Sequence, residues 1–219
     1  MKLQCLVFDA YGTLFDVHSV VALAEEIFPG RGENLSQLWR SKQLEYTWQR
    51  TLMGRYEDFS MITRDSLEYA CRALELELQP GDGKRLLDAY RHLDAFSETR
   101  AALESLLPRR LAILSNGSPS MLTPMVENAG FSSFFDFVLS VDELKLYKPH
   151  PRVYQLACDK FALEPANIGF VSSNFWDVSG ATHFGFQSFW INRSNAVADP
   201  LGATPRAVLS RLTDLAQHV

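Results

Sequence analysis

The chain has 219 residues, of which 47% are hydrophobic and 21% charged, and its formal net charge is −5. This length and composition suit one folded domain, or one domain that carries an inserted subdomain. The negative charge and the absence of a basic block argue against nucleic acid as a partner, so an anionic ligand must be held by local positive charge.

The cysteines and the N-terminus indicate the cellular setting. The three cysteines lie far apart, include no CxxC pair and are odd in number, which is typical of a reducing compartment: Cys5, Cys71 and Cys158. The apolar start MKLQCLVFDA is interrupted by Asp9 too early for a signal peptide or a membrane span. We therefore expect a cytoplasmic protein with no membrane partner, and the histidine spacing predicts no structural zinc.

The first predicted element is a buried strand, Leu3–Phe8, because a short apolar run stops there at turn-forming residues. From Asp16 to about Phe96 the spacing of apolar residues becomes helical. One helical face, for example, carries Leu35, Leu38 and Trp39.

After Phe96 short predicted strands alternate with predicted helices. The helices are expected at Glu98–Leu107, Met121–Ala129, Val153–Phe161, Trp176–His183 and Pro205–Ala216. The strands are expected at Leu111–Leu114, Phe137–Leu139, Ile168–Val171 and, as the last strand, Ser188–Ile191. Such alternation predicts a parallel sheet that is covered by helices on both faces.

The expected fold is therefore α/β: a doubly wound, Rossmann-like parallel sheet core with an inserted helical cap subdomain. We expect the core to comprise residues 1–15 and 97–219, and the cap to comprise residues 16–96. Polar residues follow the predicted strand ends, notably Asp9, Ser115, Asn116, Lys148 and Ser172. Ligands of open parallel sheets bind beyond the carboxyl ends of the strands, so we expect the functional site there.

Four signals occur in one order along the chain: VFDAYGTL around Asp9, LSNG from Leu114, a Lys-Pro pair at Lys148, and SSNFWD from Ser172. Each signal lies at the end of a predicted strand or in the loop that follows one. Together they resemble the haloacid dehalogenase superfamily, and within it the L-2-haloacid dehalogenases, over essentially the whole chain. The resemblance implies that Asp9 is a nucleophile.

Two positions separate this chain from the phosphatases of the same superfamily. The phosphatases usually carry a second Asp where this chain has Tyr11, and that Asp protonates a departing alkoxide. A halide needs no proton to depart. The phosphatases also carry Gly-Asp where this chain has Ser172 and Ser173, and serine is a poor substitute for the Asp that helps to hold Mg²⁺. The resemblance therefore implies an enzyme with no metal and no other cofactor.

The resemblance also implies roles for a catalytic set: Asp9, Thr13, Lys148, Asp177, Asn174 and Ser172. Lys148 would pair with both carboxylates, while Asp177 would help to orient Lys148 and the hydrolytic water. Lys145 competes with Lys148, but only Lys148 precedes a proline. From the residues alone, Asp177 is also an acceptable cap for the helix that follows, and a lysine before a proline is usually a solvated loop residue.

A second set would bind the substrate and the halide: Ala10, Tyr11, Arg40, Ser115, Asn116, Trp176, Leu44, Phe59 and Tyr154. By the resemblance, Ser115 would hold the substrate carboxylate and Arg40 would receive the halide. A guanidinium stays cationic and can stabilise a departing anion in a dry pocket. Without the resemblance, Arg40 is an ordinary solvated helix residue and Leu44 is core.

The expected reaction is hydrolysis of a short (S)-2-haloacid to an (R)-2-hydroxyacid and halide, through an ester on Asp9. Two alternatives remain open at this point: a magnesium-dependent phosphatase of the same superfamily, and a non-catalytic protein that binds small acids on the same scaffold. The expected partners are the substrate and the halide product. Because the dehalogenases of this type are commonly dimers, the resemblance also implies a homodimer.

Overall fold

The computed structural model describes residues 3–219, so Met1 and Lys2, which the predicted core includes, lie outside the described range. Within this range six strands form one parallel sheet in the order β3-β2-β1-β4-β5-β6. They are β1 (Cys5–Phe8), β2 (Arg110–Ser115), β3 (Phe137–Ser140), β4 (Ile168–Ser172), β5 (Gln187–Ile191) and β6 (Ala207–Leu209). The first strand therefore lies inside the sheet, and later strands are added on both sides of it.

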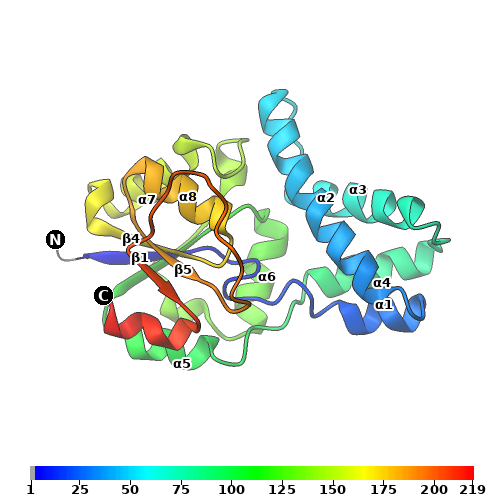
Figure 1. The fold of residues 1–219 in the computed structure, drawn as a ribbon, viewed down its shortest axis with the longest axis horizontal. Helices are drawn as coiled ribbons and strands as arrows, with labels where there is room; N and C mark the ends of the chain where they lie inside the picture. Colours follow the sequence, from blue (N-terminus) through cyan, green and yellow to red (C-terminus); the bar gives the residue numbers. More distant parts are fainter. Residues whose placement is uncertain (1–2) are drawn as a thin grey trace.

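Helices cover both faces of the sheet, with α5 and α6 on one face and α7 and α8 on the other (Figure 1). Their bounds are α5 (Thr99–Leu106), α6 (Pro119–Asn128), α7 (Pro151–Phe161) and α8 (Phe175–Phe184). Since both faces are covered, β1 and β4 are buried along their whole length, which explains their continuous apolar sequences. The predicted α/β fold is confirmed.

Between β1 and α5 the chain forms four helices that lie beside the sheet (Figure 1): α1 (Val21–Ile27), α2 (Gly32–Leu52), α3 (Phe59–Ala73) and α4 (Pro80–Tyr90). The start of α3 is fixed by the Asp58 carboxylate, which accepts the N–H of Ser60 at 2.7 Å. Pro80 opens α4, where a missing N–H costs nothing. The indole N–H of Trp39 donates to the carbonyl of Thr63 at 2.8 Å and so links α2 to α3.

Hydrogen bonds also tie the connection between α2 and α3 to the loop before α7. The Tyr56 hydroxyl donates to Asp142 at 2.8 Å, and the Tyr147 hydroxyl donates to the carbonyl of Glu57 at 2.7 Å. The rings of Tyr56 and Tyr147 stack with their centroids 5.1 Å apart. Since Tyr147 directly precedes Lys148, these contacts hold the helices beside the sheet against the loop that carries Lys148.

The predicted helix Pro205–Ala216 is wrong, and Ser188–Ile191 is not the last strand. The segment forms β6 and then a 3₁₀-helix, Leu212–Gln217. Its buried leucines recur every three residues, at Leu209, Leu212 and Leu215. A 3₁₀-helix places side chains three residues apart on one face, so this spacing does not distinguish an α-helix from a strand followed by a 3₁₀ turn. The other predicted core elements are found with ends shifted by up to two residues.

Gly169, inside β4, allows close packing against the side chains of β1. A Cβ at this position would lie 2.5 Å from Cδ2 of Leu6. We expect Gly169→Ala to lower the free energy of unfolding by about 1–3 kcal/mol, because the core must shift to admit the methyl group. Urea unfolding measures this change. Gly81→Ala is the matched control, since Gly81 has open space around it, and equal midpoints for the two variants would contradict the explanation.

Candidate active site

Four polar side chains meet at the carboxyl ends of the central strands. Asp9 follows β1, Ser172 ends β4, Lys148 lies in the loop before α7, and Asp177 lies in the first turn of α8. β1 and β4 pair directly, so Asp9 and Ser172 are neighbours across the sheet. All four residues are 5% exposed or less, so the site is an interior one.

The Lys148 ammonium lies between two carboxylates. Its Nζ is 3.0 Å from Oδ1 of Asp9 and 2.8 Å from Oδ2 of Asp177. Burial acts to lower the pKa of Lys148, but the Asp177 and Asp9 carboxylates raise that pKa above its ordinary value, so the amine stays charged. Lys145, the competing lysine, instead pairs with Asp142 at the surface, where 61% of its side chain is exposed.

The second oxygen of Asp9 accepts three hydrogen bonds. Oδ2 lies 3.1 Å from the Thr13 hydroxyl, 3.3 Å from the Ser172 hydroxyl and 2.8 Å from Nδ2 of Asn174. The same Asn174 nitrogen lies 3.1 Å from the carbonyl oxygen of Tyr11. The two Asp9 oxygens therefore differ: Oδ1 faces the lysine, and Oδ2 is surrounded by donors.

Asp177 is held by two donors in the protein interior. Besides Lys148, the Tyr154 hydroxyl donates to its Oδ1 at 2.8 Å. Burial raises the pKa of Asp177 to about 6, against the opposing effect of Lys148. Burial also raises the pKa of Tyr154 well above its ordinary value, so Tyr154 remains a donor. Asp177 is therefore anionic near neutral pH and becomes neutral in mild acid.

The polar residues after β2 support the lysine loop. The Asn116 side-chain oxygen accepts the backbone N–H of Lys148 at 3.0 Å. The Ser115 hydroxyl is fully buried and accepts the N–H of Gly117 at 3.0 Å. Asn116 thus contacts the loop that carries Lys148, and Ser115 ends β2, the strand that pairs with β1.

The turn after β1 places an aromatic wall next to Asp9. The carbonyl of Ala10 accepts the N–H of Leu14 at 2.9 Å and closes the turn. The Tyr11 ring packs on Phe59 of α3, with centroids 5.2 Å apart. The Tyr11 hydroxyl is buried without a hydrogen-bond partner in the described structure, and burial raises its pKa above the ordinary value. Tyr11 is therefore a poor proton donor.

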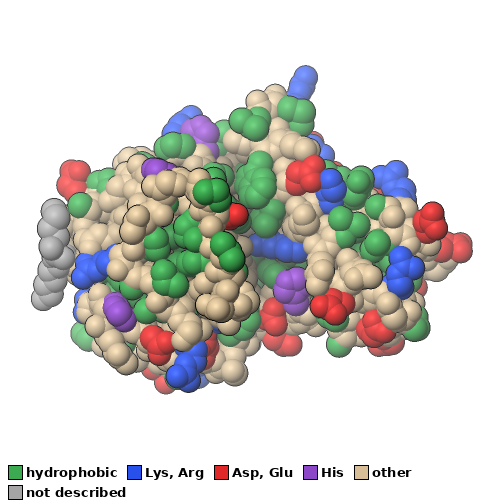
Figure 2. Space-filling view, in the orientation of Figure 1, with side chains coloured by type: hydrophobic (Ala, Val, Ile, Leu, Met, Phe, Trp, Pro, Cys, Tyr) green, Lys and Arg blue, Asp and Glu red, His purple; other side chains and the backbone are tan. Residues whose placement is uncertain are grey.

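Arg40 and Leu44 lie one turn apart on α2, toward the sheet. Nη2 of Arg40 is 3.5 Å from the Tyr11 carbonyl oxygen. Both residues line a cavity of about 430 Å³, which they share with Gly12, Asn174, Trp190 and Arg193, among others. Figure 2 shows a hollow between the two parts of the molecule with cationic side chains inside it. Trp176 packs edge-to-face on Trp48 of α2 with ring centroids 5.5 Å apart.

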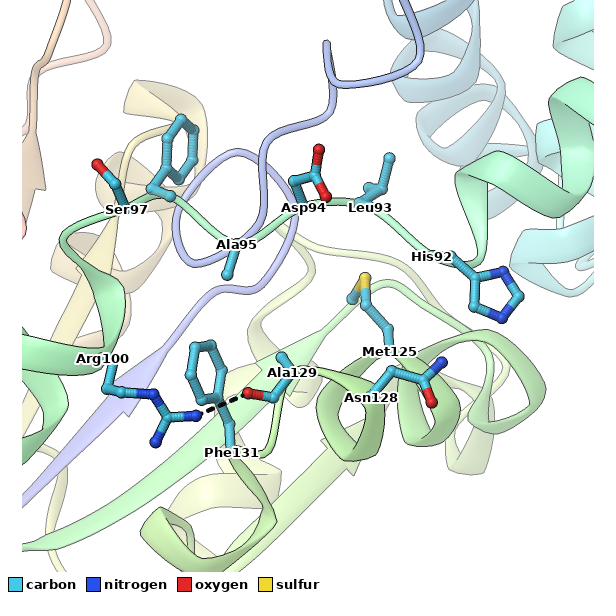
Figure 3. Close-up of a pocket in the computed structure, with 11 residues that line it drawn as sticks. His92, Leu93, Asp94, Ala95, Ser97, Arg100, Met125, Asn128, Ala129 and Phe131 are labelled. Atoms are coloured by element: carbon cyan, nitrogen blue, oxygen red, sulfur yellow. Dashed lines mark hydrogen bonds between the residues drawn. The ribbon is translucent and has the colours of Figure 1, made fainter. Parts of the chain in front are cut away.

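A second cavity, of about 420 Å³, lies along His92–Ser97, the segment that returns the chain from α4 to the sheet (Figure 3). There Arg100 donates to the carbonyl of Ala129 at 2.9 Å. None of the predicted site residues lines this cavity, whereas three of them, Arg40, Leu44 and Asn174, line the cavity of about 430 Å³.

Arg193 was not singled out from the sequence, yet it binds the loops that carry the site. Its guanidinium donates to the Thr13 carbonyl at 2.9 Å and to the Ser173 hydroxyl at 2.9 Å, and it pairs with Glu98 at 2.9 Å. It therefore joins the turn after β1 to the loop after β4. The one available signal was its position just beyond the carboxyl end of a predicted strand.

The described residues, 3–219, contain no group of three or more His, Cys, Asp or Glu side chains placed to hold a metal ion. Near Asp9, the Asn174 amide and the Thr13 and Ser172 hydroxyls supply hydrogen bonds to Oδ2. These neutral donors and the Lys148 ammonium are the groups that balance the charge of Asp9.

Comparison with known proteins gives a consistent result. The family described as haloacid dehalogenase-like hydrolase matches residues 3–185. An (S)-2-haloacid dehalogenase of Pseudomonas sp. (strain YL) is 51% identical over 202 residues, which cover 91% of this chain and 87% of that protein.

Solved structures agree over nearly the full length. The crystal structure of the L-2-haloacid dehalogenase RSc1362 has a TM-score of 0.97 at 47% identity, covering 99% of this chain and 98% of that chain. The L-2-haloacid dehalogenase from Xanthobacter autotrophicus, with chloropropionic acid covalently bound, has a TM-score of 0.91 at 40% identity, with the same two coverages of 99% and 98%.

Replacing the buried lysine should destabilise the fold. We expect Lys148→Met to lower the free energy of unfolding by about 3–5 kcal/mol near neutral pH, because Asp9 and Asp177 lose their shared counter-charge. The loss should be smaller at pH 5 than at pH 8, since protonation of a buried carboxylate relieves the cost. Urea unfolding at both pH values measures it. Lys145→Met is the control and should change little; equal effects of both substitutions at pH 8 would contradict the assignment.

Proposed function

Because the chain belongs to the haloacid dehalogenase-like hydrolase family, we propose that it is a hydrolytic dehalogenase that converts short (S)-2-haloacids to (R)-2-hydroxyacids and halide. The observation that carries this proposal is the pairing of a buried Asp9 with Lys148 next to a Tyr11 hydroxyl that is a poor acid. Such a site has a nucleophile but no side chain at position 11 suited to protonating a leaving group. It therefore suits a leaving group that departs as a stable anion.

In the first step Oδ1 of Asp9 attacks C2 of the substrate from the side opposite the halogen. The new C2–O bond forms as the C2–halogen bond breaks, and the halide leaves with the bonding electrons, giving an ester on Asp9. Oδ1 is the more available nucleophile, because it accepts one hydrogen bond, from Lys148, whereas Oδ2 accepts three. The covalent chloropropionic acid in the Xanthobacter autotrophicus relative supports such an intermediate.

The surrounding residues would hold the two ends of the substrate. Its carboxylate would bind the Ser115 hydroxyl and the backbone N–H groups near Ala10 and Tyr11. The departing halide would be received by Arg40, Asn116 and Trp176, whereas the apolar walls would come from Leu44 and Phe59. The burial of Phe59 and of the Tyr11 ring keeps this region dry, which strengthens each charge interaction within it.

In the second step water attacks the carbonyl carbon of the Asp9 ester, and the Cγ–Oδ1 bond breaks. Oδ1 leaves as the hydroxyl oxygen of the product and takes one proton of the water, while the other proton is released to solvent. The water would be polarised by Asp177, Lys148 and Asn174. Negative charge then develops on Oδ2, where the Thr13, Ser172 and Asn174 donors are already aimed. The C2–O bond survives this step, so the configuration at C2 is inverted once overall.

The helices beside the sheet complete the proposed site. We assign residues 16–96 to a cap and residues 1–15 with 97–219 to the core. This assignment is supported by one cavity: Arg40 and Leu44 of α2 line it together with Asn174, which directly precedes α8. The reactive carboxylate would thus come from the core, and the halide-binding guanidinium from the cap.

The dehalogenase proposal is favoured over both alternatives considered from the sequence. For a phosphatase, the position of the metal-binding Asp is occupied by Ser173, whose hydroxyl accepts a hydrogen bond from Arg193 at 2.9 Å. A protein that only binds acids has no need for a buried Asp9–Lys148–Asp177 group, which is costly to desolvate. Halide release from haloacetates and both 2-chloropropanoate enantiomers tests the proposal; turnover of phosphate monoesters that requires Mg²⁺ would contradict it.

A homodimer and a cytoplasmic location are also part of the proposal. Leu52 and Met53, at the end of α2, are 87% and 62% exposed and offer an apolar surface for a second copy.

The three cysteines are buried and free, which suits a reducing compartment. No helix in residues 3–219 combines the length and apolarity needed to cross a membrane. Size-exclusion chromatography with light scattering tests the dimer.

A single turnover in ¹⁸O-water should place the label in Asp9 and leave the hydroxyacid unlabelled, because water attacks the ester carbonyl. The enzyme is used in excess over (S)-2-chloropropanoate, and the peptide that contains Asp9 is analysed by mass spectrometry. Asp16, close by in the sequence, is the internal control and should stay unlabelled. Label in the hydroxyacid from the first turnover would mean that water attacks C2 directly.

The turnover number should fall as pH decreases through about 6, because protonated Asp177 no longer holds Lys148 and the water in place. Tyr154→Phe should move this decline to higher pH, since the Tyr154 hydrogen bond favours the ionised carboxylate. The measurement is kcat between pH 5 and pH 8. A decline that does not move in Tyr154→Phe would show that a different group titrates.

A further inference from the structure

Gln43 is a fully buried polar residue on α2, three positions after Arg40, and the dehalogenase resemblance assigns it no role. Its side-chain oxygen accepts a hydrogen bond from Nη1 of Arg40 at 2.6 Å and another from the Tyr90 hydroxyl at 2.9 Å. Its Nε2 donates to the Thr63 hydroxyl at 2.7 Å. Gln43 therefore connects three helices of the cap at one point.

The partners fix the orientation of the amide. A guanidinium is always a donor, and burial raises the pKa of Tyr90, so Tyr90 also remains a donor. Both must face the Gln43 oxygen, which leaves the nitrogen for Thr63. The Thr63 hydroxyl in turn donates to the Phe59 carbonyl at 2.6 Å, so it is oriented to accept from Gln43. The hydrogen bond to Thr63 of α3 thus fixes the orientation of the Gln43 oxygen toward Arg40.

The Gln43 oxygen that accepts the hydrogen bond from Arg40 belongs to an uncharged amide. A carboxylate at the same place would form a buried ion pair with Arg40 and cancel much of its field. An amide oxygen orients the guanidinium by a hydrogen bond and leaves its full positive charge available. The second Arg40 nitrogen, Nη2, is then directed toward the turn after β1, 3.5 Å from the Tyr11 carbonyl.

We propose that Gln43 is a positioning residue for dehalogenation: it holds Arg40 as an undiminished cation at the place where the halide departs. The inference rests on the proposed function, in which Arg40 receives the halide. Tyr90 belongs to the same arrangement, because it shares the Gln43 oxygen and its ring stacks on that of Tyr11, with centroids 6.1 Å apart. A small displacement of Arg40 would therefore weaken stabilisation of the departing anion without altering the nucleophile.

The test compares Gln43→Met, which removes the acceptor, with Gln43→Glu, which keeps an acceptor but adds a charge. Both are assayed with (S)-2-chloropropanoate and (S)-2-bromopropanoate. We expect Gln43→Met to lower kcat for the chloro acid by about 10- to 100-fold, and for the bromo acid by less, because bromide departs with less assistance. We expect Gln43→Glu to be slower than wild type on both acids. Gln49→Met, an exposed site on the same helix, is the matched control and should keep wild-type rates.

A double-mutant cycle with Arg40→Met separates a role through Arg40 from a general structural role. If Gln43 acts through Arg40, then Gln43→Met should cost no more than about twofold in the Arg40→Met background. The inference would be overturned if Gln43→Met lowered kcat by the same factor in both backgrounds, or by the same factor for both halides. It would also be overturned if either Gln43 variant kept the wild-type rate. In each of these cases, a low kcat of Arg40→Met would leave the proposed function intact. Wild-type turnover by Arg40→Met would instead overturn the halide role of Arg40, and the inference with it.

Discussion

An ammonium group enclosed by two carboxylates is the interaction on which the rest of the site depends. Lys148 is fully buried, and charges of this kind are stable in a protein interior only when they are paired and hydrogen-bonded. The arrangement leaves a net negative charge, which is spread over Asp9 and Asp177 and moderated by hydroxyl and amide donors. Under the proposed function, the lysine would keep the Asp9 carboxylate ionised for attack and the Asp177 carboxylate ionised for ordering water.

The topology of the sheet explains why these groups meet. The strand before Asp9 lies inside the sheet, and the chain adds strands first on one side and then on the other. Lys148 lies on the segment that crosses between the two sides, from β3 through α7 to β4. Residues far apart in sequence therefore converge at the point where the order of strands reverses, as is usual for ligand sites in open parallel sheets.

The sequence predicted those parts of the protein that local patterns encode. Short apolar runs located the central strands, and the polar residues after them, such as Asp9 and Ser172, are the ones the structure brings together. Pro205–Ala216 was mispredicted because its leucine spacing fits more than one structure, and pairing with β5 decides the outcome. Gln43 and Arg193 could not be found in this way, because a polar residue in a helix or loop looks solvated until its distant partners are known.

The paired rings of Tyr56 and Tyr147 constrain how the two halves of the molecule can move apart. Tyr147 is covalently next to the lysine and bonded to the backbone of Glu57 in the neighbouring half. Any swing of the helices that begins on this side must either break these bonds or drag the ammonium away from both carboxylates. Opening on this side would therefore disturb the ion pairs of Lys148 with Asp9 and Asp177. Entry of a ligand through the cavity lined by Arg40 and Arg193 leaves those ion pairs in place.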